Sequence, residues 1–388
     1  MTYAHRKDIY DADTHMMEHP NWIYDFADED IKDHLEPIVE GDDEALERID
    51  EALNNFELRQ SSPELLEEAK KQFMSWNHKG WEGLGAFDAN ERKLANDLLG
   101  FKAHIVFPTS AFDQVLAAKK ERIIIGGVEA LNRGMASFCS VDSRMHGAAY
   151  IPFAFGAEKA LGFLREAIRS GFSVIMIDTI APEGRQAFTH PDFDIVWSEI
   201  QQNDITITLH VGADNGWDPV PLSFYNNDGQ VPPHKEGDAP RDALAYMGIS
   251  YNAELFLASM IFDGIFQRFP HLRIGVVELG ASWIISWMKQ LDQSFRAFRR
   301  LQDLSQVKLL PSEYVMKHIK LTPFAGEDIG WLLNNGAEDL LMFASDYPHH
   351  EGTDDPISRF EKTMIGINED KKSKFYSENF KSLLGSHL

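Results

Sequence analysis

The most informative stretch lies near the N-terminus, where acidic and imidazole side chains alternate. The stretch YDADTHMMEHP at 10–20 puts Asp11, Asp13 and His15 two residues apart, directly after the apolar Ile9. If the backbone is extended there, all three side chains project to the same face. Carboxylates and an imidazole on one buried face desolvate one another unless a cation lies between them. The spacing therefore indicates a metal site, with a polar turn as the alternative.

Residues of the same kinds follow other short apolar runs. His210 ends the run in TLHVG, Glu278 follows the valines of RIGVVELG, and Asp346 lies in LLMFASDYPHH. Each one alone has an ordinary explanation, as a hydrogen-bonded core histidine or as a helix cap. In a parallel α/β barrel, however, chemistry collects at the carboxyl ends of the strands. Together with Asp13 and His15 these residues bring two histidines and three carboxylates to one end of the barrel. From them we predict a metal shell of two histidines and two carboxylates, which suits zinc and also manganese or iron.

Eight short β-branched or aromatic runs alternate with helical patterns along the chain. The runs are 8–15, 101–111, 147–156, 172–179, 204–214, 271–280, 317–325 and 340–350. Nearly continuous apolar strands between amphipathic helices are typical of a parallel sheet that is covered on both faces. Eight such units predict a (β/α)8 TIM barrel of the α/β class, and a doubly wound open sheet is the alternative. The first strand lacks a glycine-rich nucleotide turn, which favours the barrel.

Residues 1–388 are expected to form a single barrel domain with one long insertion after the first strand. The insertion, 20–100, has a first half with helical spacing and a dense acidic face, and a second half rich in aromatic residues and glycine. The piece at 76–87 is either a lid over a pocket or a part of the core. A second segment, 215–240, is a long loop rich in proline and glycine, and such loops are often functional.

Composition excludes several classes of partner. The net charge of −24 argues against binding nucleic acid or an anionic membrane, because phosphate groups would be repelled over most of the surface. No run of about 18 apolar residues is present, and the N-terminal segment has no apolar signal-peptide core. The single cysteine, Cys139, cannot form an internal disulfide, which fits a reducing compartment. We therefore expect a cytoplasmic protein.

Six motifs along the chain follow the pattern of a known family. They are DADTHMMEHP, GFKAHIVFPT, TLHVG, RIGVVELGASW, FASDYPHHEG and the closing YSENFKSLLG. These motifs resemble the amidohydrolase superfamily, in the branch related to aminocarboxymuconate semialdehyde decarboxylase. The resemblance covers most of the chain except 20–100. It implies a metal-dependent (β/α)8 barrel that acts on a small organic substrate, and it also implies a homodimer.

The resemblance also implies a role for individual residues. The family's two first-strand ligands fall on Asp13 and His15, with aspartate in place of the first histidine, and the fifth-strand ligand falls on His210. Asp346 is expected to bind the metal and to take a proton from bound water. Decarboxylases of this branch carry a histidine where this chain has Glu278. The fourth strand ends in MIDT, without the carboxylated lysine of binuclear relatives, so one divalent ion is expected, with a second ion held by Glu278 as the alternative.

Three functions are compatible with this set of residues. The leading hypothesis is a metal-dependent hydrolase, in which Asp346 is the general base for a metal-activated water and His210 and Glu278 complete the catalytic set. The alternative is a metal-dependent, non-oxidative decarboxylase of an aromatic or unsaturated acid, in which His349 or His350 supplies the proton. The third is a barrel that binds a ligand without catalysis.

A few further residues near the motifs are candidates for contacts with the substrate. They are Glu18, Trp76, His78, His349 and His350. A structural role, or a place on a loop surface, explains each of them equally well. Arg144, in VDSRMHG, is expected to anchor a loop by ion pairing.

Overall fold

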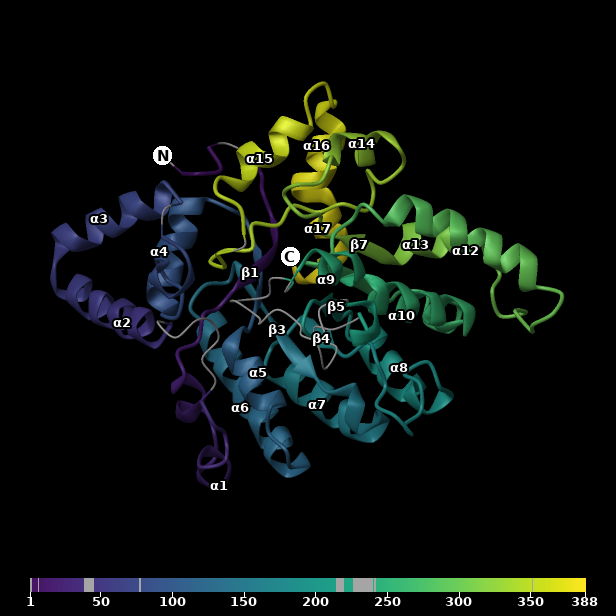
Figure 1. Ribbon diagram of the computed structural model, residues 1–388, viewed down its shortest axis with the longest axis horizontal. Helices are drawn as coiled ribbons and strands as arrows, with labels where there is room; N and C mark the ends of the chain where they lie inside the picture. Colours follow the sequence, from purple (N-terminus) through teal and green to yellow (C-terminus); the bar gives the residue numbers. More distant parts are fainter. Residues whose placement is uncertain are drawn as a thin grey trace. The chain divides into compact units, whose positions relative to one another are not determined.

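The chain divides into two compact units. The computed structural model describes residues 2–5, 7–37, 45–76, 78–213, 220–225, 240, 242–350 and 352–388 (Figure 1). Unit 1 comprises Met1–Ala148, Pro233–Arg241 and Ala344–Phe360, and unit 2 comprises Ala149–Pro232, Asp242–Phe343 and Glu361–Leu388. Of the loop predicted to be functional at 215–240, only 220–225 and 240 belong to the described residues.

The sheet of unit 1 begins with the alternating stretch near the N-terminus. Its strands are β1 (Asp11–His15), β2 (His104–Phe107) and the first part of β3 (Met145–Ile151). Neighbours pair in parallel, with Asp11 opposite His104 and His104 opposite Met145. Tyr347, in the run expected to be the eighth strand, forms an isolated parallel bridge to Thr14. This bridge brings the segment around Tyr347 to the carboxyl end of β1.

Helices fill the long segment between β1 and β2. The helical elements of unit 1 are η1 (Trp22–Asp25), α1 (Glu29–Lys32), α2 (Ala45–Ser61), α3 (Pro63–Met74), η2 (Gly80–Glu82), α4 (Ala89–Leu99), α5 (Ser110–Leu116), α6 (Glu121–Cys139) and the start of α15 (Pro356–Thr363). Capping explains two of these boundaries: the Ser62 hydroxyl accepts from Leu65 N at α3, and the Asp88 carboxylate accepts from Glu91 N at α4. Gly100, at φ 72°, ends α4 in the left-handed conformation that glycine favours.

The helices between β1 and β2 pack against the segment that directly follows β1. Met17, Ile49 and Trp81 belong to one buried apolar cluster. Trp76 is also buried, and its ring lies 5.9 Å from the ring of Tyr347. The 76–87 piece, a lid or a core element by sequence, is therefore part of the core of unit 1.

Unit 2 contains four further parallel strands. They are β4 (Val174–Ile177), β5 (Thr206–His210), β6 (Arg273–Val277) and β7 (Ile319–Leu321), paired in chain order. Val277 lies opposite His210, so the carboxyl ends of β5 and β6 are level. Leu341 forms an isolated parallel bridge to Leu321. The predicted eighth run, 340–350, therefore forms two isolated bridges, at Leu341 and at Tyr347, instead of a regular strand.

Helical segments lie before, between and after these strands. They are η3 (Phe153–Phe155), α7 (Ala157–Arg169), η4 (Pro191–Phe193), α8 (Asp194–Gln202), η5 (Leu222–Phe224), α9 (Ala243–Gly248), α10 (Tyr251–Phe262), α11 (Ile265–Arg268), α12 (Ile284–Phe298), α13 (Pro311–His318), α14 (Ile329–Asn334), α16 (Glu369–Ser373), η6 (Lys374–Glu378), α17 (Asn379–Leu384) and η7 (Gly385–His387). In α7 the buried positions are Ala160, Leu161, Leu164 and Ala167, one stripe of a helix. Helix α17 packs on β6 and β7, and Thr206 Oγ of β5 donates to Leu383 O of this helix at 2.8 Å.

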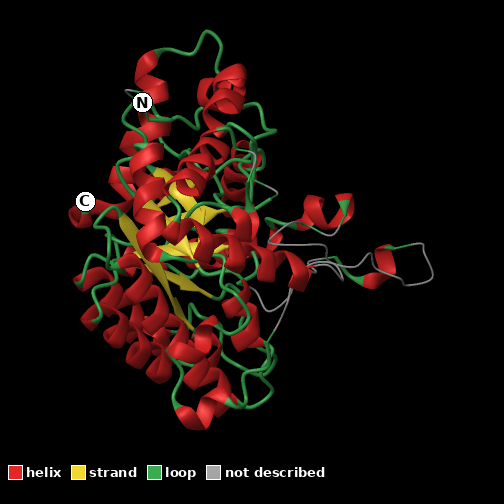
Figure 2. Ribbon diagram, turned by 90° about the vertical axis from the view of Figure 1, so that its left-hand side faces the viewer, coloured by secondary structure: helices red, strands yellow, loops and turns green. Residues whose placement is uncertain are grey.

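The observed elements confirm the predicted α/β class with parallel strands. Within each unit every pair of neighbouring strands is parallel, and helices make up much more of the chain than strands do (Figure 2). Arg144 forms ion pairs with Asp142 at 2.7 Å and with Asp97 at 2.6 Å, which confirms its predicted anchoring role. Among the helices of the described residues, none combines the length and the apolar character needed to cross a membrane.

Candidate active site

A cluster of buried ionisable side chains lies at the carboxyl end of β1 in unit 1. Asp13 and His15 come from β1 itself, and Asp346 and His349 flank the bridge that Tyr347 makes to this strand. His15 Nε2 lies 3.3 Å from Asp13 Oδ1 and 3.6 Å from Asp346 Oδ1. His349 Nδ1 lies 3.1 Å from the same Asp346 oxygen. Unit 1 therefore brings together the predicted metal ligands Asp13, His15 and Asp346 and the candidate acid His349.

The Thr109 hydroxyl joins the two imidazoles of this cluster. The rings of His15 and His349 stack with centroids 3.8 Å apart. Thr109 Oγ lies 3.2 Å from His15 Nδ1 and 2.9 Å from His349 Nε2. A hydroxyl has one proton, so in a chain of hydrogen bonds it donates to one ring and accepts from the other. The two ring nitrogens facing Thr109 consequently have opposite protonation states.

Two buried charged side chains hold the backbone around this cluster. The Arg92 guanidinium donates to the carbonyl oxygens of His15 and Gly85. The Glu18 carboxylate accepts from the backbone N–H of Thr109 at 3.1 Å and from that of the nearby Ala111 at 3.3 Å. Burial raises the pKa of Glu18 to about 7. Glu18, a candidate for substrate contact by sequence, thus fixes the position of the Thr109 backbone.

Asp11 differs from the other acidic residues of β1. The sequence predicts that Asp11, Asp13 and His15 all surround a metal, but the Asp11 carboxylate accepts from Ser345 N at 2.9 Å and from Ser345 Oγ at 2.6 Å. Burial raises the pKa of Asp11 to about 8. Asp11 therefore anchors the residue that precedes Asp346.

The backbone at Asp346 has an unusual conformation. Its φ is 55°, and Glu278 in unit 2 has a φ of 56°. The left-handed region costs a residue with a side chain on the order of 1–2 kcal/mol, and such residues cluster at functional sites. Burial raises the pKa of Asp346, while the neighbouring His349 lowers it. Asp346 N donates to Asp13 O at 3.0 Å, which fixes the two acidic residues relative to each other.

Unit 2 supplies a second, smaller group at the carboxyl ends of β5 and β6. His210 Nε2 lies 3.6 Å from Glu278 Oε2, and both side chains are buried. His210 Nδ1 lies 2.8 Å from the carbonyl oxygen of Val211. A carbonyl only accepts, so Nδ1 carries the proton, and Nε2 of the neutral ring keeps its lone pair. This is the state in which an imidazole binds a metal.

The remaining candidates for substrate contacts lie in different surroundings. His78 is exposed, and Trp76 packs in the core of unit 1. His350 is exposed too, and its imidazole lies directly against Gly80. Only His349 lies in the cluster with Asp346.

Two further residues on which this cluster depends were not among the candidates from the sequence. They are Thr109, at the end of the motif GFKAHIVFPT, and Arg92, in the segment assigned to the insertion. The place of Thr109 near the carboxyl end of the predicted strand 101–111 is the signal that could have drawn attention to it. Arg92 gives no such signal, because its partners are backbone carbonyls.

The donor set in unit 1 fits a divalent cation. His15, Asp346 and His349 each offer a ligand atom, and these atoms lie within 4.8 Å of one another. Asp13 adds a second buried carboxylate beside His15. Buried carboxylates require a compensating positive charge, and a mixed set of imidazole nitrogens and carboxylate oxygens suits zinc, manganese or iron.

Comparison with known proteins identifies the family. The family model for amidohydrolases matches residues 93–385, which is most of the chain. The chain therefore belongs to the amidohydrolase family, and the resemblance found in its motifs is confirmed. No curated protein sequence matches this chain significantly.

Solved structures share the fold at low sequence identity. An amidohydrolase from Mycobacterium avium subsp. paratuberculosis K-10 is 17% identical with a TM-score of 0.70, covering 98% of this chain and 100% of its own. The 5-carboxyvanillate decarboxylase from Novosphingobium aromaticivorans, solved with manganese and 4-hydroxy-3-methoxy-5-nitrobenzoic acid, is 18% identical with a TM-score of 0.63, covering 99% of each chain. The 2,6-dihydroxybenzoate decarboxylase from Rhizobium is 17% identical with a TM-score of 0.63, covering 97% and 98%.

Proposed function

We propose that this protein is a metal-dependent, non-oxidative decarboxylase of an aromatic or unsaturated acid. We also propose that residues 1–388 form a single (β/α)8 barrel domain with an insertion at 20–100. The observation that carries the proposal is the pair of Asp346 and the buried His349, which lies next to the donors Asp13 and His15. Two decarboxylases among the structures of the same fold support this reaction over hydrolysis. We also propose a cytoplasmic homodimer.

The proposed metal ligands are Asp13, His15, His210 and Asp346. The two carboxylates and His15 form the donor set of unit 1, and Nε2 is the nitrogen of the neutral His210 ring that carries no proton. Glu278, 3.6 Å from His210 Nε2, is proposed as a proton shuttle. A bound divalent ion, zinc or manganese, would supply the positive charge that holds the substrate carboxylate.

The hydrogen-bond chain through Thr109 determines which ring nitrogen of His349 carries the proton. If His15 uses Nε2 as a ligand, its Nδ1 carries the proton and donates to Thr109 Oγ. The hydroxyl must then donate to His349 Nε2, which leaves the proton of His349 on Nδ1. That nitrogen lies 3.1 Å from Asp346 Oδ1, so the protonated nitrogen of His349 lies beside the Asp346 carboxylate.

The proposed reaction begins with a proton transfer to carbon. A proton held by the Asp346–His349 pair adds to the substrate carbon that bears the carboxylate. The bond from that carbon to the carboxylate then breaks, its electron pair returns to the unsaturated system, and carbon dioxide leaves. The pair regains a proton from water, so one proton is consumed for each carbon dioxide released.

Carbon dioxide release tests this proposal directly. Protein supplied with manganese or zinc is incubated with 2-hydroxybenzoic acids and related unsaturated acids, and carbon dioxide and the decarboxylated product are quantified. In deuterium oxide we expect deuterium at the vacated carbon. His349→Gln should lower turnover by about a hundredfold, whereas His350→Gln, its exposed neighbour, should change it little. Hydrolysis of esters, lactones or amides without any carbon dioxide release would contradict the proposal.

Hydrolysis is the second candidate. Asp346 lies beside the donor set, 3.6 Å from His15 Nε2, where a carboxylate would accept a proton from an attacking water. The same variants serve for its test with an ester, lactone and amide panel. Turnover of those substrates that requires the divalent ion and is lost in Asp346→Asn would favour this reaction.

A further inference from the structure

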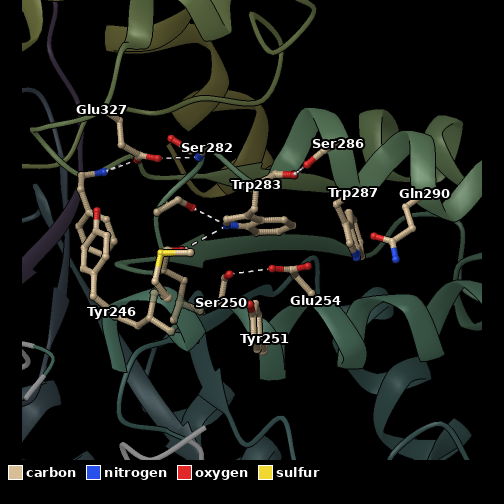
Figure 3. Close-up of a pocket in the computed structure, with 15 residues that line it drawn as sticks. Tyr246, Ser250, Tyr251, Glu254, Ser282, Trp283, Ser286, Trp287, Gln290 and Glu327 are labelled. Atoms are coloured by element: carbon tan, nitrogen blue, oxygen red, sulfur yellow. Dashed lines mark hydrogen bonds between the residues drawn. The ribbon is translucent and has the colours of Figure 1, made fainter. Parts of the chain in front are cut away.

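A cavity of about 450 Å³ in unit 2 lies beside the loops that follow β6 and β7 (Figure 3). Its walls come from α9, the start of α10, the first turns of α12 and those loops. Its size falls within the range of small-molecule sites. None of the residues that line it belongs to the proposed metal and catalytic set.

Aromatic rings form much of the wall of this cavity. Trp283 and Trp287 stand nearly perpendicular, with ring centroids 5.3 Å apart at 81°. The Trp283 indole N–H donates to Gly280 O at 2.9 Å, which holds this ring in place. Tyr246 and Tyr251 also line the cavity, and these residues are 45% and 52% exposed. In Figure 3, Tyr246 and Trp287 lie on opposite sides of Trp283.

The charged groups of the wall are all negative. The described lining includes two glutamates and no lysine, arginine or histidine. Glu327 already accepts backbone N–H groups from Ala281, Ser282 and Phe324. Glu254, by contrast, accepts a hydrogen bond from Ser250 Oγ at 2.7 Å. A carboxylate has room for further donors or for a cation.

We propose that this cavity binds a small organic cation that carries a tertiary or quaternary ammonium group. Such a group is attracted to the faces of tryptophan and tyrosine rings, and it has few or no N–H donors that need hydrogen-bond partners. Glu254 supplies the opposite charge at the same wall. An anion would meet only like charge here, and the net charge of −24 favours cations further.

The environment of Glu254 supports this choice of ligand. Burial raises the pKa of Glu254, so its charged form is disfavoured in the empty cavity. An adjacent cation would stabilise that charged form. A neutral ligand of the same shape would give no such gain, and this difference makes the proposal testable.

The test compares choline with its neutral isostere 3,3-dimethyl-1-butanol by isothermal titration calorimetry at constant ionic strength. We expect saturable binding of choline and binding of the alcohol that is weaker by about tenfold or more. Glu254→Gln and Tyr251→Ala should each weaken choline binding about fivefold or more. Glu199→Gln, the same change on α8 outside the cavity wall, is the matched control and should bind as the wild type does.

Three results would overturn the proposal. Equal affinity for choline and the alcohol would mean that the cavity recognises apolar shape alone. The absence of saturable choline binding would remove the site. This holds whether light scattering shows a monomer or a dimer that covers the cavity. Loss of choline binding on removal of divalent ions with EDTA would assign the ligand to the proposed metal centre. Because the cavity shares no residue with that centre, binding is expected to persist in EDTA whether or not the proposed reaction is correct.

Discussion

Two kinds of buried histidine in this protein differ in their partners and not in their exposure. His318, in α13 of unit 2, has its Nδ1 2.8 Å from Leu272 O, and its ring stacks on Phe266 with centroids 4.4 Å apart. His15, in β1 of unit 1, has two carboxylates within 3.6 Å of Nε2. The exposed fractions are 3% for His318 and 0% for His15. Burial alone therefore does not mark a functional histidine.

The partners explain what each histidine requires. A carbonyl and an aromatic ring are neutral, so a neutral His318 is compatible with its surroundings, and burial lowers its pKa to about 4. The carboxylates of Asp13 and Asp346 add negative charge beside His15, and that charge requires a cation. The comparison predicts that substitutions near His15 change chemistry, whereas substitution of His318 changes stability.

The largest expected effect is that of His15→Asn, compared with His318→Asn. Loss of the ligand nitrogen should reduce bound metal from about one ion per chain to near zero and abolish turnover. His318→Asn should keep both the bound metal and the turnover of the wild type. Elemental mass spectrometry on dialysed protein measures the metal, and equal loss of metal in the two variants would contradict the comparison.

Asp346→Asn should have the next largest effect. The amide keeps the shape of the side chain but cannot hold or accept the proton, so we expect turnover to fall by about a hundredfold or more while metal stays bound. Steady-state kinetics with the metal content measured in parallel checks this. Nearly normal turnover would remove Asp346 from the proposed catalytic roles.

Thr109→Val should have a smaller effect, because it breaks the chain between His15 and His349 without removing a ligand. Loss of such an outer partner typically costs about tenfold to a hundredfold in metal affinity or activity. Thr109→Ser keeps the hydroxyl and is the matched control. Metal affinity and the pH profile of turnover are measured for both; if Thr109→Val and Thr109→Ser behave alike, the hydroxyl is not part of the chain.

The smallest effect concerns stability and involves His318. Its pKa is about 4 in the folded protein, against 6.5 for an unperturbed histidine, so between these values the unfolded chain binds more protons. This group therefore makes the free energy of unfolding fall as pH drops from 6.5 to 4, by about 1 kcal/mol per pH unit. His318→Asn should flatten this slope in urea denaturation experiments at several pH values. An unchanged slope would mean that His318 does not titrate in this way.

Several features of the fold and site followed from sequence because they depend on local pattern. The alternation in β1 puts Asp13 and His15 on one face, since side chains of a strand alternate. Apolar runs between amphipathic helices gave the parallel α/β class and the order of the strands. The motif around Asp346 and His349 identified the last site segment, although that segment forms isolated bridges and not a regular strand.

Other features depend on contacts between residues that are distant in the chain, and only the tertiary structure decided them. Asp11 has the same spacing as Asp13, but its partner Ser345 lies 334 positions away, so no local pattern could reveal that it anchors a backbone segment. His349 and His350 are adjacent, yet packing buries only the first in the cluster. Thr109 lies 94 positions from His15 and 240 from His349, so the hydrogen bonds that join them exist only in the folded chain. Residue type and local spacing determined the donors, and long-range packing decided which partners each donor received.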